Sequence, residues 1–355
     1  MSKCIYYATT VDVSDFSAQS LQIRSMSHAF NKISRLDFKL YAFSSFETEY
    51  KASFPTRLLK TKKSKLIRSV YIFLCILFDK GTDYSIFTRD LYLALLFVLV
   101  GKNVIWEAHQ ETTGGAKRIL KILNYFSSFK VLTISEALKC SNEITINKDK
   151  IYTYHDGVSL SEQYINNQKP VSFSNKNTAV YTGALHKGGD IESLEPLFDK
   201  FFDWDFLFIG GNDFDIKRYQ RIFAKYKNVM FVGRLPHNEI LRYQKSASVL
   251  LYPLTTTNKL WRYTSPLKLF EYMSSGRPIV GSNIGSVCEI IDERNAFVFK
   301  GDKGVVDAFE RYLCSSKSAI LDKISINIDL IENKYNWDKR VEFIVTDVLK
   351  LSAEC

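Results

Sequence analysis

The chain has 355 residues, of which 46% are hydrophobic and 24% are charged. This length suits two domains, each with its own core, and the composition excludes a disordered or fibrous protein. The net charge is +10, but no recognition-helix, zinc-finger or RNA-binding pattern accompanies it, so nucleic acid is not the expected partner.

Three further features bear on the compartment. The longest apolar run, residues 91–100, is much shorter than the roughly 20 residues that span a bilayer. The start of the chain lacks the apolar core of a signal peptide. The six cysteines are scattered without metal-ligand spacing, as expected for thiols in a reducing cytosol. We therefore expect a cytoplasmic protein that is not an integral membrane protein.

The first half of the chain alternates between strand and helix patterns. Strands are predicted at residues 4–8, 39–43, 84–88, 103–107, 131–134 and 151–154. Helices are predicted between them, at residues 17–32, 67–78, 91–100 and 116–129. Such alternation predicts a parallel sheet that helices cover on both faces.

The alternation begins again after a polar stretch at residues 163–177. Strands are predicted at residues 178–181, 205–209, 229–232 and 249–253, with helices at residues 191–202, 214–225 and 239–246. Two such units predict an α/β protein with two Rossmann-like domains that face one cleft.

The segment from Ser265 to Glu289 is the most informative part of the chain. Pro266 fits the first turn of a helix, and Gly276 fits its end. A short buried strand follows, and then a loop of small residues that is expected to open onto another helix near Val287.

A strand, a loop of small residues and a helix N-terminus together form a site for anions, because unpaired backbone N–H groups point outward there. The carboxylate of Glu271, on the preceding helix, can reach a sugar hydroxyl. Phosphate beside polyol is the chemical outline of a nucleotide sugar.

The order of these residues resembles the donor-binding segment of the GT-B glycosyltransferases, specifically of glycosyltransferase family 4. The family pattern runs roughly P-L-K-x-x-E-Y-M, a glycine, P-V-V, a loop and an acidic residue before paired aliphatics. The residues that match it are Pro266, Leu267, Lys268, Glu271, Tyr272, Met273, Gly276, Pro278, Ile279, Val280 and Glu289 with Ile290 and Ile291.

The resemblance is strong over residues 178–345 and diffuse over residues 1–160. It implies a GT-B fold with an N-terminal Rossmann-like acceptor domain at residues 1–165 and a C-terminal donor domain at residues 178–335. It also implies that a terminal helix, residues 336–355, packs back on the N-terminal domain.

The resemblance also implies a donor site. Glu271 corresponds to the carboxylate that binds the donor ribose, and Tyr263 stands where the family often has a second glutamate. The sugar-side contacts are then expected from Thr264, Ser265 and Lys268. The expected phosphate ligands are the N–H groups of Gly285, Ser286 and Val287, and Arg234 is expected near the nucleobase.

Two further residues correspond to catalytic groups of the family. Lys187 lies in a loop where a basic residue neutralises the diphosphate, and the family's arginine in that loop is Ala184 here. His109 ends a predicted strand and corresponds to a histidine near the donor sugar and the acceptor. Glu107 and Glu111 flank it and are expected to support it.

The activity implied is a retaining, metal-independent transfer of a sugar from a nucleotide diphosphate sugar, such as a UDP- or GDP-sugar, to a saccharide or lipid-linked acceptor. Bacterial surface polysaccharide synthesis is the expected context, with no cofactor.

Asp213 and Asp215 form a DxD motif, but their place at a helix start is explained by capping. A partner subunit that only binds a nucleotide sugar, and a nucleotide-sugar epimerase of GT-B fold, remain open alternatives.

Charge is concentrated in the first half of the chain. Residues 1–168 hold 22 Lys and Arg against 15 Asp and Glu, a net charge of +7. The densest cluster comprises Lys60, Lys62, Lys63, Lys65 and Arg68, just before apolar residues 70–78. This pattern suits peripheral attachment to an anionic membrane surface, and equally the solvated start of a core helix.

Overall fold

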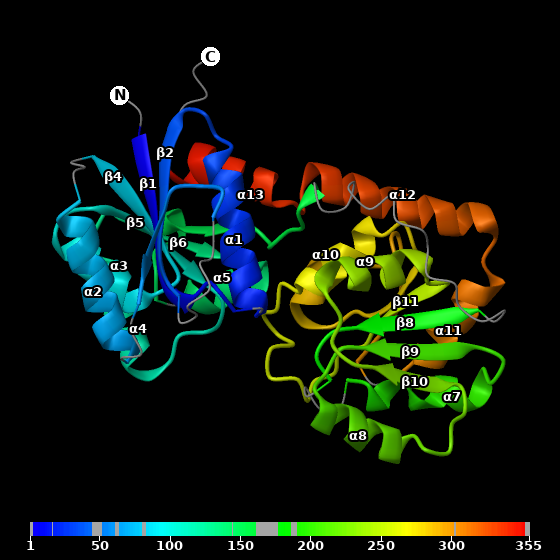
Figure 1. The fold of residues 1–355 in the computed structure, drawn as a ribbon. Coiled ribbons are helices and arrows are strands. Elements are labelled where there is room, and N and C mark those ends of the chain that lie inside the picture. The colour runs from blue at the N-terminus through cyan, green and yellow to red at the C-terminus, as the bar shows by residue number, and fades with distance from the viewer. Residues whose placement is uncertain are drawn as a thin grey trace. The chain divides into compact units, whose positions relative to one another are not determined.

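The computed structural model describes residues 3–15, 17–44, 52–60, 64–79, 83–143, 145–160, 177–185, 190–301 and 303–351. The chain divides into two compact units (Figure 1). Unit 1 comprises Met1–His155 and Trp337–Cys355, and unit 2 comprises Asp156–Asn336. Each unit is built around its own sheet.

Unit 1 contains a seven-stranded sheet in the order β3-β2-β1-β4-β5-β6-β7, in which every neighbouring pair is parallel. The strands are β1 (Lys3–Asp12), β2 (Leu36–Phe43), β3 (Thr56–Leu59), β4 (Tyr84–Thr88), β5 (Asn103–Ala108), β6 (Phe129–Thr133) and β7 (Ile151–Thr153). The strand order reverses between β1 and β4, and ligands of such sheets bind beyond the carboxyl ends of the strands near this point.

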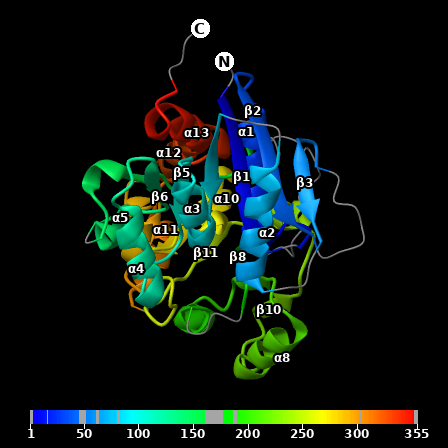
Figure 2. The ribbon, with the colours of Figure 1, turned by 90° about the vertical axis from the view of Figure 1, so that its left-hand side faces the viewer.

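Helices cover both faces of this sheet. They are α1 (Ala18–Asn31), α2 (Lys65–Leu77), α3 (Leu91–Leu99), α4 (Gly114–Leu123), α5 (Glu136–Asn142) and α13 (Trp337–Phe343). Figure 2 shows α2, α3 and α4 side by side in front of the sheet, while α1 lies with α13 on the other face. Asp90 starts α3 by accepting hydrogen bonds from the N–H groups of Tyr92 and Leu93, as an N-cap residue does.

Unit 2 contains a six-stranded parallel sheet in the order β10-β9-β8-β11-β12-β13. The strands are β8 (Thr178–Thr182), β9 (Asp205–Ile209), β10 (Val229–Val232), β11 (Val249–Tyr252), β12 (Ile279–Ser282) and β13 (Phe297–Phe299). The same reversal of strand order falls here between β8 and β11. Both units therefore have Rossmann-like topology.

The period of two along each strand divides the core of unit 2 into two layers. On β8, Ala179 and Tyr181 pack with the apolar residues of α7 (Glu195–Lys200), α8 (Asp213–Ile222) and α11 (Val305–Cys314). Val180 faces the opposite layer, which includes residues of α10 (Leu267–Ser274) and α12 (Lys317–Asn333). The α9 helix (His237–Ser246) contributes its partly buried residues to this second layer.

Two predicted helices differ from the observed ones. The helix predicted at residues 116–129 ends at Leu123, because Phe129 already begins β6. The helix predicted at residues 191–202 is divided into the 3₁₀ turn Glu192–Leu194 and α7. In the part of the chain that the structure describes, no helix is both long enough and apolar enough to cross a bilayer.

Candidate functional site

Two glycines shape the carboxyl end of β8 and β9 in unit 2. Gly183 follows β8 with φ +139°, and Gly210 follows β9 with φ +120°. A Cβ atom on Gly210 would lie 2.2 Å from the carbonyl oxygen of Gly183. The two loops therefore approach each other through backbone alone, which only glycine permits.

Lys268 lies in the first turn of α10, next to this loop. Its Nζ lies 4.0 Å from the ring centroid of Tyr181 and 5.2 Å from that of Tyr252, and a Cβ on Gly183 would be 3.2 Å from it. Within the described part of the chain, Nζ makes no hydrogen bond and no ion pair. Burial lowers the pKa of Lys268, although the nearby Tyr272, Asp190 and Glu271 oppose this. An anion bound here would supply the missing partner.

Glu271 lies one turn further along α10 and is held from α9. Its Oε2 accepts a hydrogen bond of 3.1 Å from Nε2 of Gln244, and its Oε1 lies 3.8 Å from Nε2 of His237. Gln244 is buried and also donates to the hydroxyl of Thr182. The carboxylate is thus fixed, with 14% of its side chain exposed.

The loop after β12 forms a 3₁₀ turn, Gly285–Glu289, and not the expected α-helix near Val287. The N–H of Ser286 donates to the carbonyl of Arg262, and its hydroxyl donates to the carbonyl of Thr264. The N–H of Val287 donates to Ile284. In this conformation, two of the three N–H groups assigned to phosphate already have protein partners.

Other predicted donor-site residues have different surroundings. The hydroxyl of Ser265 accepts a 2.8 Å hydrogen bond from the N–H of Asp156, at the start of unit 2. Arg234 is exposed in the loop between β10 and α9. Lys187 lies outside the described residues, so its role stays a prediction.

The DxD motif opens α8. Asn212 caps this helix by accepting the N–H of Asp215 at 2.9 Å, and Asp213 and Asp215 both lie in its first turn. Within the described ranges, no group of three or more His, Cys, Asp or Glu residues could hold a metal ion.

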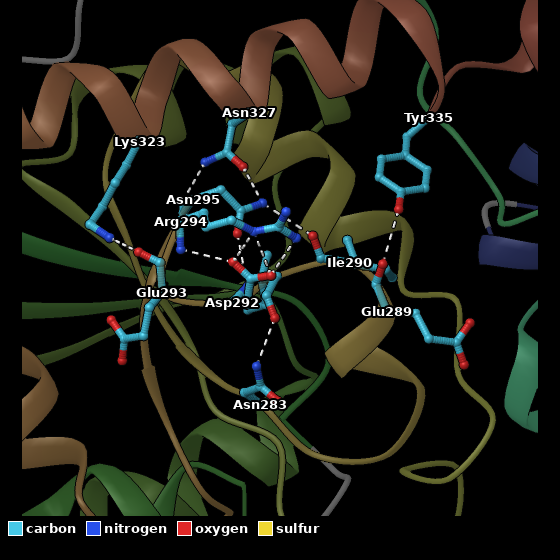
Figure 3. A network of polar contacts seen from close by, with 11 residues as sticks. Asn283, Glu289, Ile290, Asp292, Glu293, Arg294, Asn295, Lys323, Asn327 and Tyr335 are labelled. Carbon is cyan, nitrogen blue, oxygen red and sulfur yellow. Dashed lines mark hydrogen bonds and ion pairs between the residues drawn. The ribbon is translucent and has the colours of Figure 1, made fainter.

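A polar network links the segment that follows the Gly285–Glu289 turn to α12 (Figure 3). The side chain of Asn327 donates to the carbonyl of Asn295 at 2.8 Å, and that of Asn295 donates back to Asn327 at 3.0 Å. The hydroxyl of Tyr335 donates to the carbonyl of Glu289. The turn is therefore anchored on the body of unit 2 rather than on neighbouring loops alone.

Unit 1 has a cavity of about 350 Å³ at the reversal point of its sheet. It lies at the ends of β1, β4 and β5 and at the beginnings of α2, α3 and α4. Its lining includes Lys65, Arg89, Trp106, His109 and Glu111. Charged groups and an aromatic ring at such a point suit a polar ligand such as a saccharide.

His109 lies in this cavity and contacts a buried carboxylate. Its Nε2 lies 2.9 Å from Oε2 of Glu107, whose side chain is fully buried. Arg340 of α13 reaches the other oxygen, with Nη2 2.5 Å from Oε1. Glu107 thus lies in contact with His109, as expected from the sequence. The contact of Arg340 with Glu107 was not predicted.

Three residues that contact the predicted carboxylates were not predicted from the sequence, because they are distant in the chain from the residues that they contact. Gln244 is 27 residues from Glu271, and Arg340 is 233 residues from Glu107. His237 follows the Gly-Arg-Leu-Pro segment that was noted only for Arg234. No local pattern marks them, since their role depends on the packing of α9 and α13.

Comparison with known proteins agrees with this geometry. Residues 176–315 match the family model described as glycosyl transferases group 1. The protein TuaH of Bacillus subtilis (strain 168), which its name assigns to teichuronic acid biosynthesis as a glycosyltransferase, is 21% identical over 181 residues. That alignment covers 46% of this chain and 44% of TuaH, so it spans less than half of either protein.

Solved structures share the fold over nearly the whole chain. Sucrose-phosphate synthase from Thermosynechococcus elongatus has a TM-score of 0.75 at 14% identity, covering 99% of this chain and 100% of that one. Anabaena HepE in complex with UDP-glucose has a TM-score of 0.74 at 11% identity, covering 98% and 100%. At such identities the likeness shows the fold.

The fold is GT-B, with two Rossmann-like units. The segment that matches the glycosyl transferases group 1 model, residues 176–315, contains Lys268, Glu271 and the Gly285–Glu289 turn. The candidate site of unit 2 therefore lies within the part of the chain that is similar to this family.

The first prediction concerns Gly285. It has φ +56°, and a Cβ would lie 2.0 Å from the carbonyl oxygen of Trp261. Gly276 also has a positive φ, +71°, but nothing lies within 4 Å of its Cβ position. Gly276→Ala should therefore cost about 1–2 kcal/mol of stability, and Gly285→Ala roughly 3–5 kcal/mol.

Denaturant unfolding of the two variants measures the difference. Equal losses of stability would mean that the contact between the turn and Trp261 is not a constraint on the fold.

Proposed function

We propose that the protein is a retaining, metal-independent glycosyltransferase that moves a sugar from a nucleotide diphosphate sugar to a saccharide or lipid-linked acceptor. The observation that carries the proposal is Lys268, a partly buried ammonium group without an ion-pair partner among the described residues. It lies one helical turn from a fixed carboxylate, at the reversal point of a parallel sheet.

In this proposal the donor binds to unit 2. The diphosphate lies at Lys268, which neutralises its charge, and the ribose diol donates to the carboxylate of Glu271. Gln244 holds that carboxylate in position. The complexes of HepE with UDP and UDP-glucose support a nucleotide sugar as the donor class.

The proposed reaction needs no covalent intermediate with the protein. The bond between the anomeric carbon and the phosphate oxygen breaks as the acceptor hydroxyl attacks from the same face, and the leaving phosphate takes up the hydroxyl proton. Lys268 stabilises the charge that develops on the phosphate, and positioning contributes the rest. His109, in the cavity of unit 1, would bind a hydroxyl of the acceptor.

Release of free UDP or GDP from a panel of donors tests this function. A glycosyltransferase releases nucleotide in proportion to the glycosylated acceptor formed. An epimerase would convert the donor without releasing nucleotide. A partner subunit would bind the donor and leave it intact, and either result would overturn the proposal.

The second prediction separates the two donor contacts. Lys268→Ala should weaken binding of UDP or GDP by roughly 1.5–3 kcal/mol but leave binding of the free nucleoside unchanged. Glu271→Ala should weaken both, each by about 1–3 kcal/mol, because the ribose hydroxyls lose their acceptor. Lys259→Ala removes an exposed lysine from a nearby segment and is the matched control.

Calorimetric titration of the three variants with nucleotide and nucleoside gives the comparison. Unchanged diphosphate affinity in folded Lys268→Ala would remove Lys268 from the donor site.

The third prediction concerns metal. Because a protein cation neutralises the diphosphate in this proposal, turnover should persist at an undiminished rate in EDTA. The measurement is the initial rate of nucleotide release with and without chelator. Complete loss on chelation, restored by manganese, would show instead that a divalent ion does this work and would direct attention to Asp213 and Asp215.

The acceptor side of the proposal involves a membrane surface. One face of α2 is apolar and exposed, with exposed fractions of 41% to 80% at Leu66, Ile67, Val70, Tyr71, Leu74, Leu77 and the adjoining Phe78. The opposite face is buried at Ile72 and Ile76, and Phe73 packs on Phe97. An exposed apolar patch of this extent is unusual for a surface that faces only water.

Basic residues accompany this face. Lys60 is exposed, and Lys65 begins α2. Arg68, by contrast, turns inward to the carbonyl of Thr10 and lies 5.3 Å from the ring centroid of Phe43. Lys62 and Lys63 lie outside the described residues. We propose that α2 rests on an anionic leaflet, with its apolar face in the interface and the lysines at the phosphates.

This location would bring lipid-linked acceptors of a surface polysaccharide to the cavity of unit 1, because Lys65 at the start of α2 also lines that cavity. The name of TuaH, which refers to teichuronic acid biosynthesis, supports the same context.

The fourth prediction tests the membrane surface. Binding to anionic vesicles should fall steeply with salt, because such attraction is screened over about 8 Å at physiological ionic strength. Changing Lys60, Lys62 and Lys63 to Gln should weaken it about 100-fold, at about 1 kcal/mol per lysine. Leu74→Gln should also weaken it, whereas Leu321→Gln, at an exposed leucine of α12, should not.

Co-sedimentation with vesicles measures the binding. Indifference of the wild-type protein to anionic vesicles at low salt would contradict the proposal, as would a stable dimer whose interface is α2.

A further inference from the structure

A buried cluster of charges lies beneath the cavity of unit 1. Glu107 projects from β5 with no exposed side-chain surface, and His109, Arg340 and Arg89 surround its carboxylate. The distance from Oε2 to Nε2 of His109 is 2.9 Å, and that to Nε of Arg89 is 3.6 Å. A carboxylate can occupy such a place only with charged partners.

Arg340 connects this cluster to the end of the chain. Its side chain is fully buried, and Nη2 donates to Oε1 of Glu107. Its Nη1 donates to the carbonyls of Tyr154 and His155, the last residues of unit 1 before the chain passes into unit 2. The helix α13 therefore contributes a side chain to the support of His109.

The charges keep Glu107 ionised. Burial alone would raise the pKa of Glu107, but the charges of His109 and Arg340, the hydrogen bond with His109 and the charge of Arg89 together lower it below its ordinary value. The carboxylate is thus a permanent acceptor. Nε2 of His109 lies 2.9 Å from this carboxylate, so a protonated imidazole is attracted to it and the orientations of the ring are limited.

We propose that Glu107 is a positioning residue for His109, and that Arg340 and Arg89 hold its carboxylate in place and balance its charge. The inference rests on the proposed function, in which His109 contacts the acceptor. It adds that the geometry and charge of His109 depend on Glu107, Arg340 and Arg89, of which Arg340 lies in α13.

Two cations, Arg340 and Arg89, lie against the carboxylate of Glu107. Their positive charges oppose the stabilisation that Glu107 gives to a protonated His109. The other charged groups of the cavity are Lys65, Asp90 and Glu111. Lys65 pairs with Asp90 at 3.5 Å, and Asp90 also accepts from Thr10. Removing Glu107 or Arg89 should therefore shift the titration of His109 in opposite directions.

The fifth prediction uses this opposition. In Glu107→Gln, the titration midpoint of His109 should fall by about 1–3 pH units, because an opposite charge in contact is lost. In Arg89→Gln, the midpoint should rise, because one of the two balancing cations is lost. Histidine NMR measures both, with the signal assigned by His109→Gln and His237 as an internal reference on unit 2.

A kinetic readout accompanies the titration. With the donor that the panel identifies, Glu107→Gln should lower kcat by roughly tenfold or more at an unchanged donor KM. Arg89→Gln provides the test if Glu107→Gln does not fold, since it leaves the pair of Arg340 and Glu107 intact.

An unchanged titration of His109 in both variants would overturn the inference and leave Glu107 as a purely structural link to α13. If the wild-type protein turned over no donor, the proposed function would be overturned instead. The NMR titration would still decide whether Glu107 and Arg89 act on His109.

Discussion

The candidate site of unit 2 depends on one cation, Lys268, that no described residue neutralises. Lys268 Nζ lies between the faces of Tyr181 and Tyr252 without an ion-pair partner in the described part of the chain. Burial lowers the pKa of Lys268, because an ammonium group without a partner is unfavourable away from water. In the proposed function, a bound anion offsets this cost. The backbone approach of Gly183 and Gly210, and the Gly285 turn against Trp261, both shape the same end of the sheet.

In unit 1, by contrast, the buried charge of Glu107 has oppositely charged partners. Glu107 is fully buried, and its partners come from three separate segments of the chain. Opposite charges in contact compensate one another in such a cluster and restrict the side chains that form it. Glu107, Arg89 and His109 of this cluster all line the cavity. We therefore propose different roles for the two charged sites: Lys268 binds an anion in unit 2, and the Glu107 cluster orients the imidazole of His109 in unit 1.

Much of the fold was predictable because the parallel strands are short apolar runs bounded by polar residues. The bounds predicted for β4, β9 and β10 are those observed. The edge strand Thr56–Leu59 was missed, because half of its residues are polar and its pattern is that of a loop. The turn after β12 was expected to begin an α-helix, since small residues at such a point usually precede one. Its Gly285 instead allows Ser286 to bond the segment at Arg262.

The site was predictable only where it is local in sequence. Lys268 and Glu271 follow from one motif on α10, whereas Gln244 and Arg340 become partners only through packing between distant helices.

A crystal structure with UDP or GDP bound would test most directly whether Lys268 binds the diphosphate. The account predicts the diphosphate within hydrogen-bond distance of Lys268 Nζ and the ribose hydroxyls on Glu271. A nucleotide bound elsewhere, with Lys268 still unpaired, would contradict it.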